Sequence, residues 1–180
     1  MSENQTSPIA FAHQAILDAK RTIIGYELFD RSVLSSTHTA ASDAQLLFNV
    51  LSGVDAESPI GKKDLFINCT HDSLSGGHLE LIAPQRVVLE IPPLPVSEID
   101  QILTRMPNLQ EIKRRGFRLA FDYSVLTKPY ALWLELASFI KFDLSVIRPQ
   151  SIGSFIKLAH AKTTAQLIAE RWRLPRNTRW

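Results

Sequence analysis

Cysteine is almost absent from the sequence, and this limits both the chemistry and the setting of the protein. Cys69 is the single cysteine among 180 residues, which excludes an internal disulfide and favours a reducing compartment. No segment approaches the ~18 consecutive apolar residues of a membrane-spanning helix, and the polar start Met1–Gln5 is unlike a signal peptide. We therefore expect a cytoplasmic protein that has no membrane partner.

Nucleic-acid-binding motifs are also missing, although basic residues gather towards the end of the chain. From Lys141 onward eight basic side chains oppose two acidic ones, a balance of +6, whereas residues 1–140 carry 12 basic and 16 acidic ones, a balance of −4. Such a segment can attract an anionic partner, and it is also what a solvated terminus looks like. Because stacking aromatics are not interleaved with these charges, we predict no DNA partner.

The composition is that of a folded domain, with 45% hydrophobic and 21% charged residues. Strand-like and helix-like segments alternate, which predicts an α/β fold with a parallel sheet, either doubly wound or closed as a barrel. One domain is expected over residues 1–170, followed by an irregular basic tail at 171–180. The expected strands are Ile9–Leu17, Thr22–Phe29, Asp64–Cys69, Arg86–Ile91, Phe117–Tyr123, Phe139–Leu144 and Thr164–Ala169. The expected helices are Ser42–Val54, Ser97–Arg115 (kinked or split at Pro107), Tyr130–Ala137 and Ile152–Ala161.

Polar residues recur at or near the carboxyl ends of these strands. They are Glu27, Asn68, Glu90, Asp122, Lys141 with Asp143, and Glu170. The carboxyl ends of the strands in a parallel barrel open on one face, where active sites are built. Oxygen ligands of this kind suit Mg²⁺, Mn²⁺ or Ca²⁺ and favour metal-assisted phosphoryl transfer. The alternative, which the residues leave open, is that Glu27, Glu90 and Asp122 form salt bridges and bonds with Arg31, Lys141 and strand-end amides.

The motifs that carry these residues resemble, in order, those of the EAL family of cyclic di-GMP phosphodiesterases. The resemblance rests on Gly25-Tyr26-Glu27-Leu28, Phe66-Ile67-Asn68, Leu89-Glu90-Ile91, Leu119-Ala120-Phe121-Asp122, Ile140-Lys141-Phe142-Asp143 and Ile168-Ala169-Glu170. The sequences of these motifs are most similar to those in the EAL half of EAL–HDOD signalling proteins. The resemblance implies an EAL-type (β/α) TIM-like barrel that is incomplete at its C-terminus.

The resemblance also implies a role for each candidate residue. The metal ligands for Mg²⁺ or Mn²⁺ would be Glu27, Asn68, Glu90 and Asp122. Lys141 would assist the attacking water, and Glu170 would serve a second metal ion or its ligands. Gln14 and Arg31 would contact the nucleotide, cyclic di-GMP, which active members open to a linear dinucleotide.

The chain departs from the family pattern at several of these positions. Tyr123 stands where the family has a second aspartate, Pro92-Pro93 replaces a second glutamate, and Arg171-Trp172-Arg173 follows Glu170. A two-metal site that lacks a bridging carboxylate loses its hold on one reacting oxygen. We therefore favour a degenerate, non-catalytic signalling module that binds a protein partner, a second copy of itself or the nucleotide, with or without metal. The alternatives are an active phosphodiesterase and a truncated gene product without activity.

Overall fold

The computed structural model describes residues 11–18, 20–30 and 62–170, and the chain divides into two compact units, residues 1–87 and 88–180. The expected helix Ser42–Val54, the candidate residue Arg31 and the expected tail 171–180 lie outside the described residues. None of the helices in the described part of the chain has the length and apolar character to cross a membrane.

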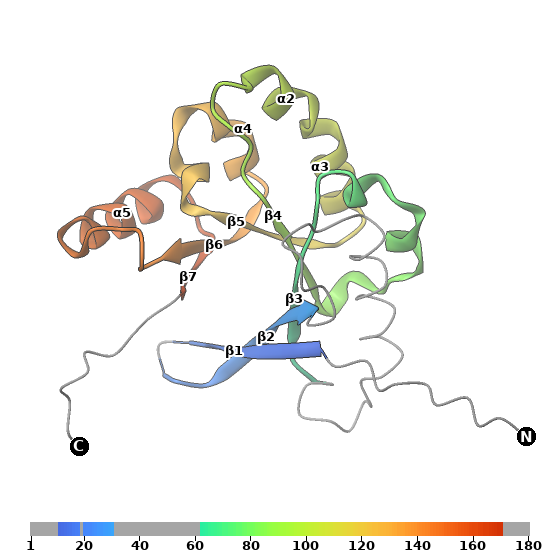
Figure 1. Ribbon diagram of the computed structural model, residues 1–180, viewed down its shortest axis with the longest axis horizontal. Coiled ribbons are helices and arrows are strands. Elements are labelled where there is room, and N and C mark those ends of the chain that lie inside the picture. Colours follow the sequence, from blue (N-terminus) through green and yellow to red (C-terminus); the bar gives the residue numbers. More distant parts are fainter. Residues whose placement is uncertain (1–10, 19, 31–61, 171–180) are drawn as a thin grey trace, which may run out of the picture. The chain divides into compact units, whose positions relative to one another are not determined.

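The first unit is built on a hairpin and one parallel strand (Figure 1). β1 (Phe11–Leu17) pairs antiparallel with β2 (Ile23–Asp30), which pairs parallel with β3 (Asp64–Asn68). Asp18 closes the hairpin, because its carboxylate accepts the N–H groups of Lys20 and Thr22, both at 2.8 Å. Arg21 takes the left-handed conformation at φ 63°, which this tight turn requires.

Gly25 allows β2 and β3 to approach closely beside the candidate residues. A Cβ at this position would lie 2.8 Å from both the carbonyl oxygen of Asp64 and the ring of Phe66. Phe66 is fully buried, so its ring has little freedom to move aside. The glycine therefore sets the spacing of the strands that carry Glu27 and Asn68.

Three short 3₁₀ helices lead away from β3: η2 (Ser73–Ser75), η3 (Gly77–Leu81) and η4 (Pro84–Arg86). The Arg86 guanidinium donates to the carbonyl oxygen of Lys63 at 2.9 and 3.2 Å. This contact joins the end of the 3₁₀ segment to the beginning of β3.

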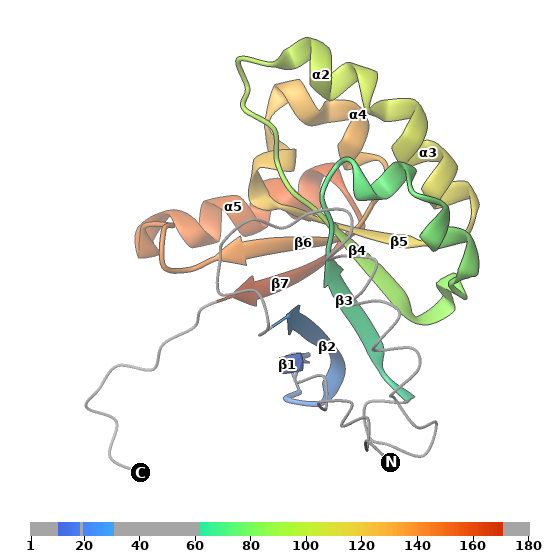
Figure 2. The same ribbon diagram turned by 45° about the vertical axis from the view of Figure 1, so that its right-hand side comes forward.

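The second unit contains four parallel strands in chain order. β4 (Val87–Ile91), which starts at the unit boundary, pairs with β5 (Arg118–Asp122), β5 with β6 (Ala137–Asp143), and β6 with β7 (Gln166–Glu170). The connections contain α2 (Ile99–Thr104), α3 (Met106–Arg114), η5 (Tyr123–Leu126), η6 (Lys128–Tyr130), α4 (Ala131–Leu134) and α5 (Pro149–Lys162). Figures 1 and 2 show α2, α3 and α4 on the same side of these strands.

Buried aromatic side chains join the helices to the sheet. Trp133 of α4 packs on Phe121 and Tyr130, with ring centroids 5.8 and 5.1 Å away, and its indole N–H donates to the carbonyl oxygen of Ile102 at 2.9 Å. The Tyr130 hydroxyl donates to the carbonyl oxygen of Leu94 and accepts from the Leu94 N–H at 2.9 Å. Leu94, in the loop after β4, is thereby held through both its backbone N–H and its carbonyl oxygen.

The helix expected over Ser97–Arg115 is two helices, as Pro107 suggested. α2 ends at Thr104, and Pro107 occupies the first turn of α3, where a missing N–H costs little. Gly116 follows α3 with φ 97°, which suits the left-handed end of a helix. The helix expected over Tyr130–Ala137 was too long, because α4 has four residues and Ala137 already belongs to β6.

Candidate functional site

In the first unit, the strand register places three candidate residues on one face of the sheet. Gln14 lies opposite Glu27 in the hairpin, Glu27 lies opposite Phe66, and Asn68 follows two residues later on the same side. The Asn68 side-chain amide donates to Glu27 Oε1 at 3.3 Å. Glu27 was expected to end its strand, but it lies within β2, which continues to Asp30.

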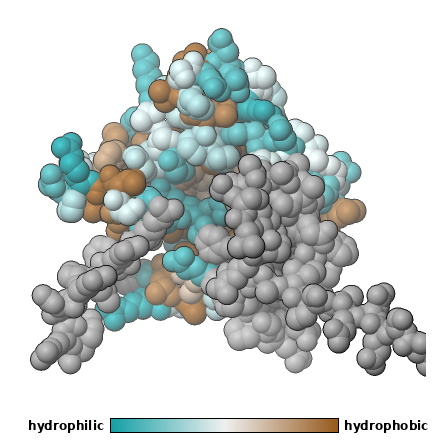
Figure 3. All heavy atoms as spheres, viewed as in Figure 1, coloured by the Kyte–Doolittle hydropathy of each residue, from teal (hydrophilic) through white to brown (hydrophobic). Residues whose placement is uncertain are grey.

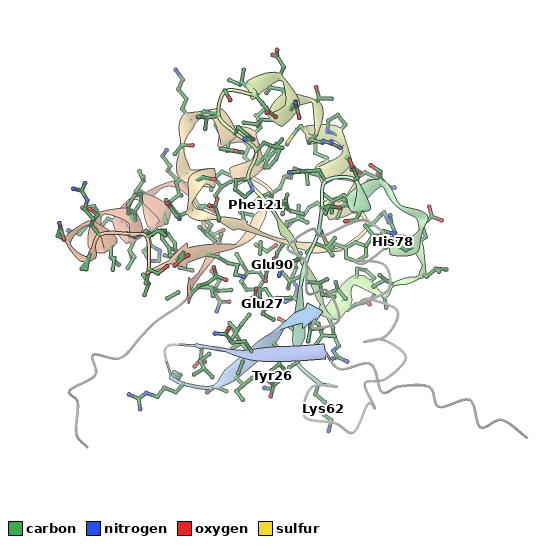
Figure 4. All side chains as sticks on the ribbon, in the orientation of Figure 1. Tyr26, Glu27, Lys62, His78, Glu90 and Phe121 are labelled. Carbon is green, nitrogen blue, oxygen red and sulfur yellow. The ribbon has the colours of Figure 1, made fainter. Side chains whose placement is uncertain are left out.

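In the second unit, Lys141 joins two candidate carboxylates. Its ammonium forms ion pairs with Glu90 Oε2 and Glu170 Oε1. Lys141 is 5% exposed and Glu90 is 8% exposed, so their charges are largely removed from water and attract each other strongly. Glu90 lies on the side of the strands opposite Phe121, which faces the helices (Figure 4).

Asp122 lies on the same face, because it is paired with Lys141 in the sheet. Its Oδ1 accepts the Ser124 N–H at 3.0 Å and also the Ser124 hydroxyl, so it caps the N-terminus of η5. Asp143 does the same after β6, where its Oδ1 accepts the Ser145 N–H at 2.8 Å and hydroxyl at 2.5 Å. Both aspartates therefore hold the turn that follows their strand.

Tyr123 points to the opposite face. Its ring stacks on Phe142 at a centroid distance of 6.3 Å and meets Phe155 of α5 edge-on at 5.5 Å. Phe142 follows Lys141 in β6, and successive strand side chains alternate between faces. The residue that replaces the family's second aspartate is thus turned away from Asp122 and Lys141.

The alternative left open by the sequence holds for two of the candidates in the second unit. Glu90 is paired with Lys141, and Asp122 binds the backbone amide and hydroxyl of Ser124. The role of Ser124 was missed. The repeated pattern Asp-x-Ser at Asp122–Ser124 and Asp143–Ser145 was the available signal, because aspartate commonly bonds to the backbone two residues on.

The side-chain oxygens of the four predicted ligands are of the chemical type that binds hard divalent cations. Carboxylate and amide oxygens are preferred by Mg²⁺, Mn²⁺ and Ca²⁺. Of the four predicted ligands, Glu27 and Asn68 belong to the first unit and Glu90 and Asp122 to the second. Asp122 uses Oδ1 for both of its bonds to Ser124, which leaves Oδ2 outside those two bonds.

No protein-family model matches the chain. The cyclic di-GMP phosphodiesterase CdgJ of Vibrio cholerae is 27% identical over 167 residues, which cover 89% of this chain and 38% of that protein. The chain therefore spans less than two fifths of the length of this relative.

Solved EAL structures have the same fold. YkuI of Bacillus subtilis, which has an EAL domain and was solved with its substrate cyclic di-GMP and calcium, matches with a TM-score of 0.60 and 21% identity, over 86% of this chain and 46% of that one. The EAL domain of Mycobacterium smegmatis DcpA matches with a TM-score of 0.63 and 21% identity, over 89% and 80%. BlrP1 of Klebsiella pneumoniae, solved with manganese and cyclic di-GMP, matches with a TM-score of 0.61 and 19% identity, over 87% and 46%.

The described residues thus have the EAL-type α/β fold that the motifs predicted. The chain is thus similar in fold to solved EAL domains and similar in sequence to the cyclic di-GMP phosphodiesterase CdgJ.

Proposed function

We propose that this chain is a degenerate EAL domain that binds cyclic di-GMP, does not hydrolyse it, and acts in signalling through its contacts. The observation that carries the proposal is the direction of Tyr123, which packs against Phe142 and Phe155. A tyrosine in this position supplies no carboxylate to the face that carries Asp122 and Lys141.

One divalent ion, Mg²⁺ or Mn²⁺, is the proposed cofactor. Its ligands would be the residues that the family pattern assigns to it, Glu27, Asn68, Glu90 and Asp122, and the ion would polarise a phosphate oxygen. The presence of calcium in the YkuI structure and of manganese in the BlrP1 structure supports an ion of this class. Gln14 and Arg31 are the proposed nucleotide contacts.

Two features of the second unit support the proposed absence of hydrolysis. Phosphodiester cleavage at a two-metal site needs ligands that hold both the attacking and the leaving oxygen, and position 123 contributes none. Lys141, proposed from the family pattern to assist the attacking water, is shared between Glu90 and Glu170. Its ammonium is thereby the counter-ion of two carboxylates.

An active phosphodiesterase remains the second candidate, and one observation favours it. Glu27, Asn68, Glu90, Asp122 and Lys141 are all present, and the relative CdgJ is a cyclic di-GMP phosphodiesterase. Losing one side-chain donor of transition-state charge commonly lowers the rate on the order of 10²–10³-fold, so weak turnover would still be measurable.

Calorimetric titration with cyclic di-GMP, with and without Mn²⁺, separates these functions when the same samples are analysed chromatographically for the linear dinucleotide. We expect Mn²⁺-dependent binding without product, and loss of binding in Glu27→Ala. Glu135→Gln, an exposed change after α4, is the control and should bind like the wild type. Product that disappears in Glu27→Ala would establish the phosphodiesterase, and no binding by folded protein would refute the nucleotide-binding function.

The third possibility, a gene product without activity, is tested in the same preparation. A functional domain should unfold cooperatively in urea, whereas a broad, noncooperative transition together with poor solubility would support the third possibility. We also propose a cytoplasmic location and binding to a protein partner or to a second copy of the chain. Size-exclusion chromatography with light scattering measures the oligomeric state.

A further inference from the structure

The side chain of Asp122 is held in place by a chain of contacts that begins on α5. Phe155 of α5 contacts both Tyr123 and Phe142, with ring centroids 5.5 and 6.4 Å away, and Tyr123 stacks on Phe142 at 6.3 Å. These three rings, which we call the aromatic brace, come from η5, β6 and α5. They fix the first residue of η5 against the helix side of the sheet.

A second contact fixes the other end of η5 to the same helix. The Lys162 ammonium, in the last turn of α5, donates to the carbonyl oxygen of Leu126 at 2.8 Å. Tyr123 and Leu126 are the first and last residues of η5. The short helix is therefore fastened to α5 at both ends.

Ser124 lies between these two ends and fixes the orientation of the Asp122 carboxylate. Its N–H and hydroxyl both bind Asp122 Oδ1, and its carbonyl oxygen accepts the Thr127 hydroxyl at 2.7 Å. Two bonds to one carboxylate oxygen restrict both side-chain torsions of the aspartate, and a displaced Ser124 would release it. The position of η5 thus sets the direction in which Asp122 presents its remaining oxygen.

We propose that Tyr123 and Phe155 are positioning residues, which hold η5 so that Ser124 orients Asp122 for its ligand. The part of this inference that concerns metal binding rests on the proposed function. The part that concerns the orientation of the Asp122 side chain does not depend on it. A residue that supports a ligand without touching the ion typically affects metal affinity 10–100-fold, which is the range expected here.

The test uses the full chain, with Mn²⁺ alone as the probe. Phe155→Ala should weaken Mn²⁺ binding about 10-fold in calorimetry below the unfolding temperature, and Tyr123→Phe, which keeps the ring, should bind like the wild type. Ile156→Ala is the matched control, because Ile156 is the next residue of α5, is 38% exposed and takes no part in the ring contacts given above. Ser124→Ala should cause a similar loss, and the double variant Phe155→Ala/Ser124→Ala should lose little more, because both changes act on one path.

A second measurement decides the inference even if Mn²⁺ does not bind the wild type. The carboxyl ¹³C resonance of Asp122, recorded without metal in aspartate-labelled protein, should move towards that of a solvated aspartate in Phe155→Ala and stay in place in Ile156→Ala. An unchanged resonance in folded Phe155→Ala would overturn the inference. If Phe155→Ala does not fold, Lys162→Met, which releases the other end of η5, replaces it with the same expected shift. A loss of thermal stability without a change in Mn²⁺ affinity or in the resonance would mean that the brace only stabilises the fold.

Discussion

Replacing Lys141 by methionine should destabilise the protein strongly, because the change leaves buried carboxylates without their counter-ion. The Lys141 side chain is 7% exposed, and its partners Glu90 and Glu170 are 9% and 28% exposed. Removing one member of a buried ion pair costs about 3–5 kcal/mol, and the methionine keeps most of the volume, so a cavity contributes little. Domains are typically stable by about 5–15 kcal/mol, so this one change removes a large share of the total.

Urea denaturation followed by far-ultraviolet circular dichroism measures the effect as a lower midpoint with an unchanged slope. Lys157→Met, on the exposed surface of the same unit, is the control and should change the unfolding free energy by less than about 0.5 kcal/mol. Adding Glu90→Gln to Lys141→Met should recover part of the loss, because it removes the more deeply buried of the two carboxylates. A loss below about 1 kcal/mol in Lys141→Met, or no recovery in the double variant, would refute the reasoning.

Three other changes probe the surroundings of the site. Tyr130→Phe removes the hydroxyl that binds both backbone groups of Leu94, so urea denaturation should show a loss of about 1–3 kcal/mol. Burial raises the pKa of the Tyr130 phenol above its ordinary value of about 10. Its contribution to stability is therefore fully present below about pH 10 and is lost as the pH rises through the raised pKa. The wild type should lose stability in that range more steeply than Tyr130→Phe, and equal slopes would contradict this. Tyr123→Asp places a carboxylate in the aromatic brace and should cost roughly 2 kcal/mol without creating a second Mn²⁺ site; a second equivalent of Mn²⁺ in calorimetry would show that position 123 can turn to the other face. Gly25→Ala brings a Cβ within 2.8 Å of the Asp64 carbonyl oxygen and should cost about 1–3 kcal/mol, so a variant as stable as the wild type in urea would show that β2 and β3 can separate freely.

The strands were predictable from the sequence because their apolar and β-branched runs are short and bounded by turn residues. Val87–Ile91 is buried throughout, as expected of a parallel strand covered on both faces. The 3₁₀ helices were not predicted, since segments of three to five residues are too short to show a hydrophobic period. Ala137 was assigned to a helix because its apolar neighbours are compatible with either element, and only pairing with β5 assigns it to β6.

The candidate residues were predictable by type and position along the strands, but most of their partners were not. The bond between Lys141 and Glu90 was one of the alternatives that the sequence left open, and because it joins residues 51 positions apart, only the register of three adjacent strands selects it. The direction of Tyr123 depends on Phe155, which reaches it from a helix 32 positions later in the chain. A motif identifies which residue stands at a position, whereas the face it occupies is decided by packing between distant segments.

Asp122 connects the proposed metal ligands to the turn that follows β5. The oxygen that caps η5 belongs to the same carboxylate that is proposed to bind the metal. A ligand that took Oδ1 would have to remove it from Ser124 and loosen the turn, whereas a ligand that used only Oδ2 would leave the turn intact. A protein that bound the surface of η5 and α5 could therefore distinguish these two modes of occupancy without reaching the site itself, and the domain could report a bound nucleotide without any chemical reaction.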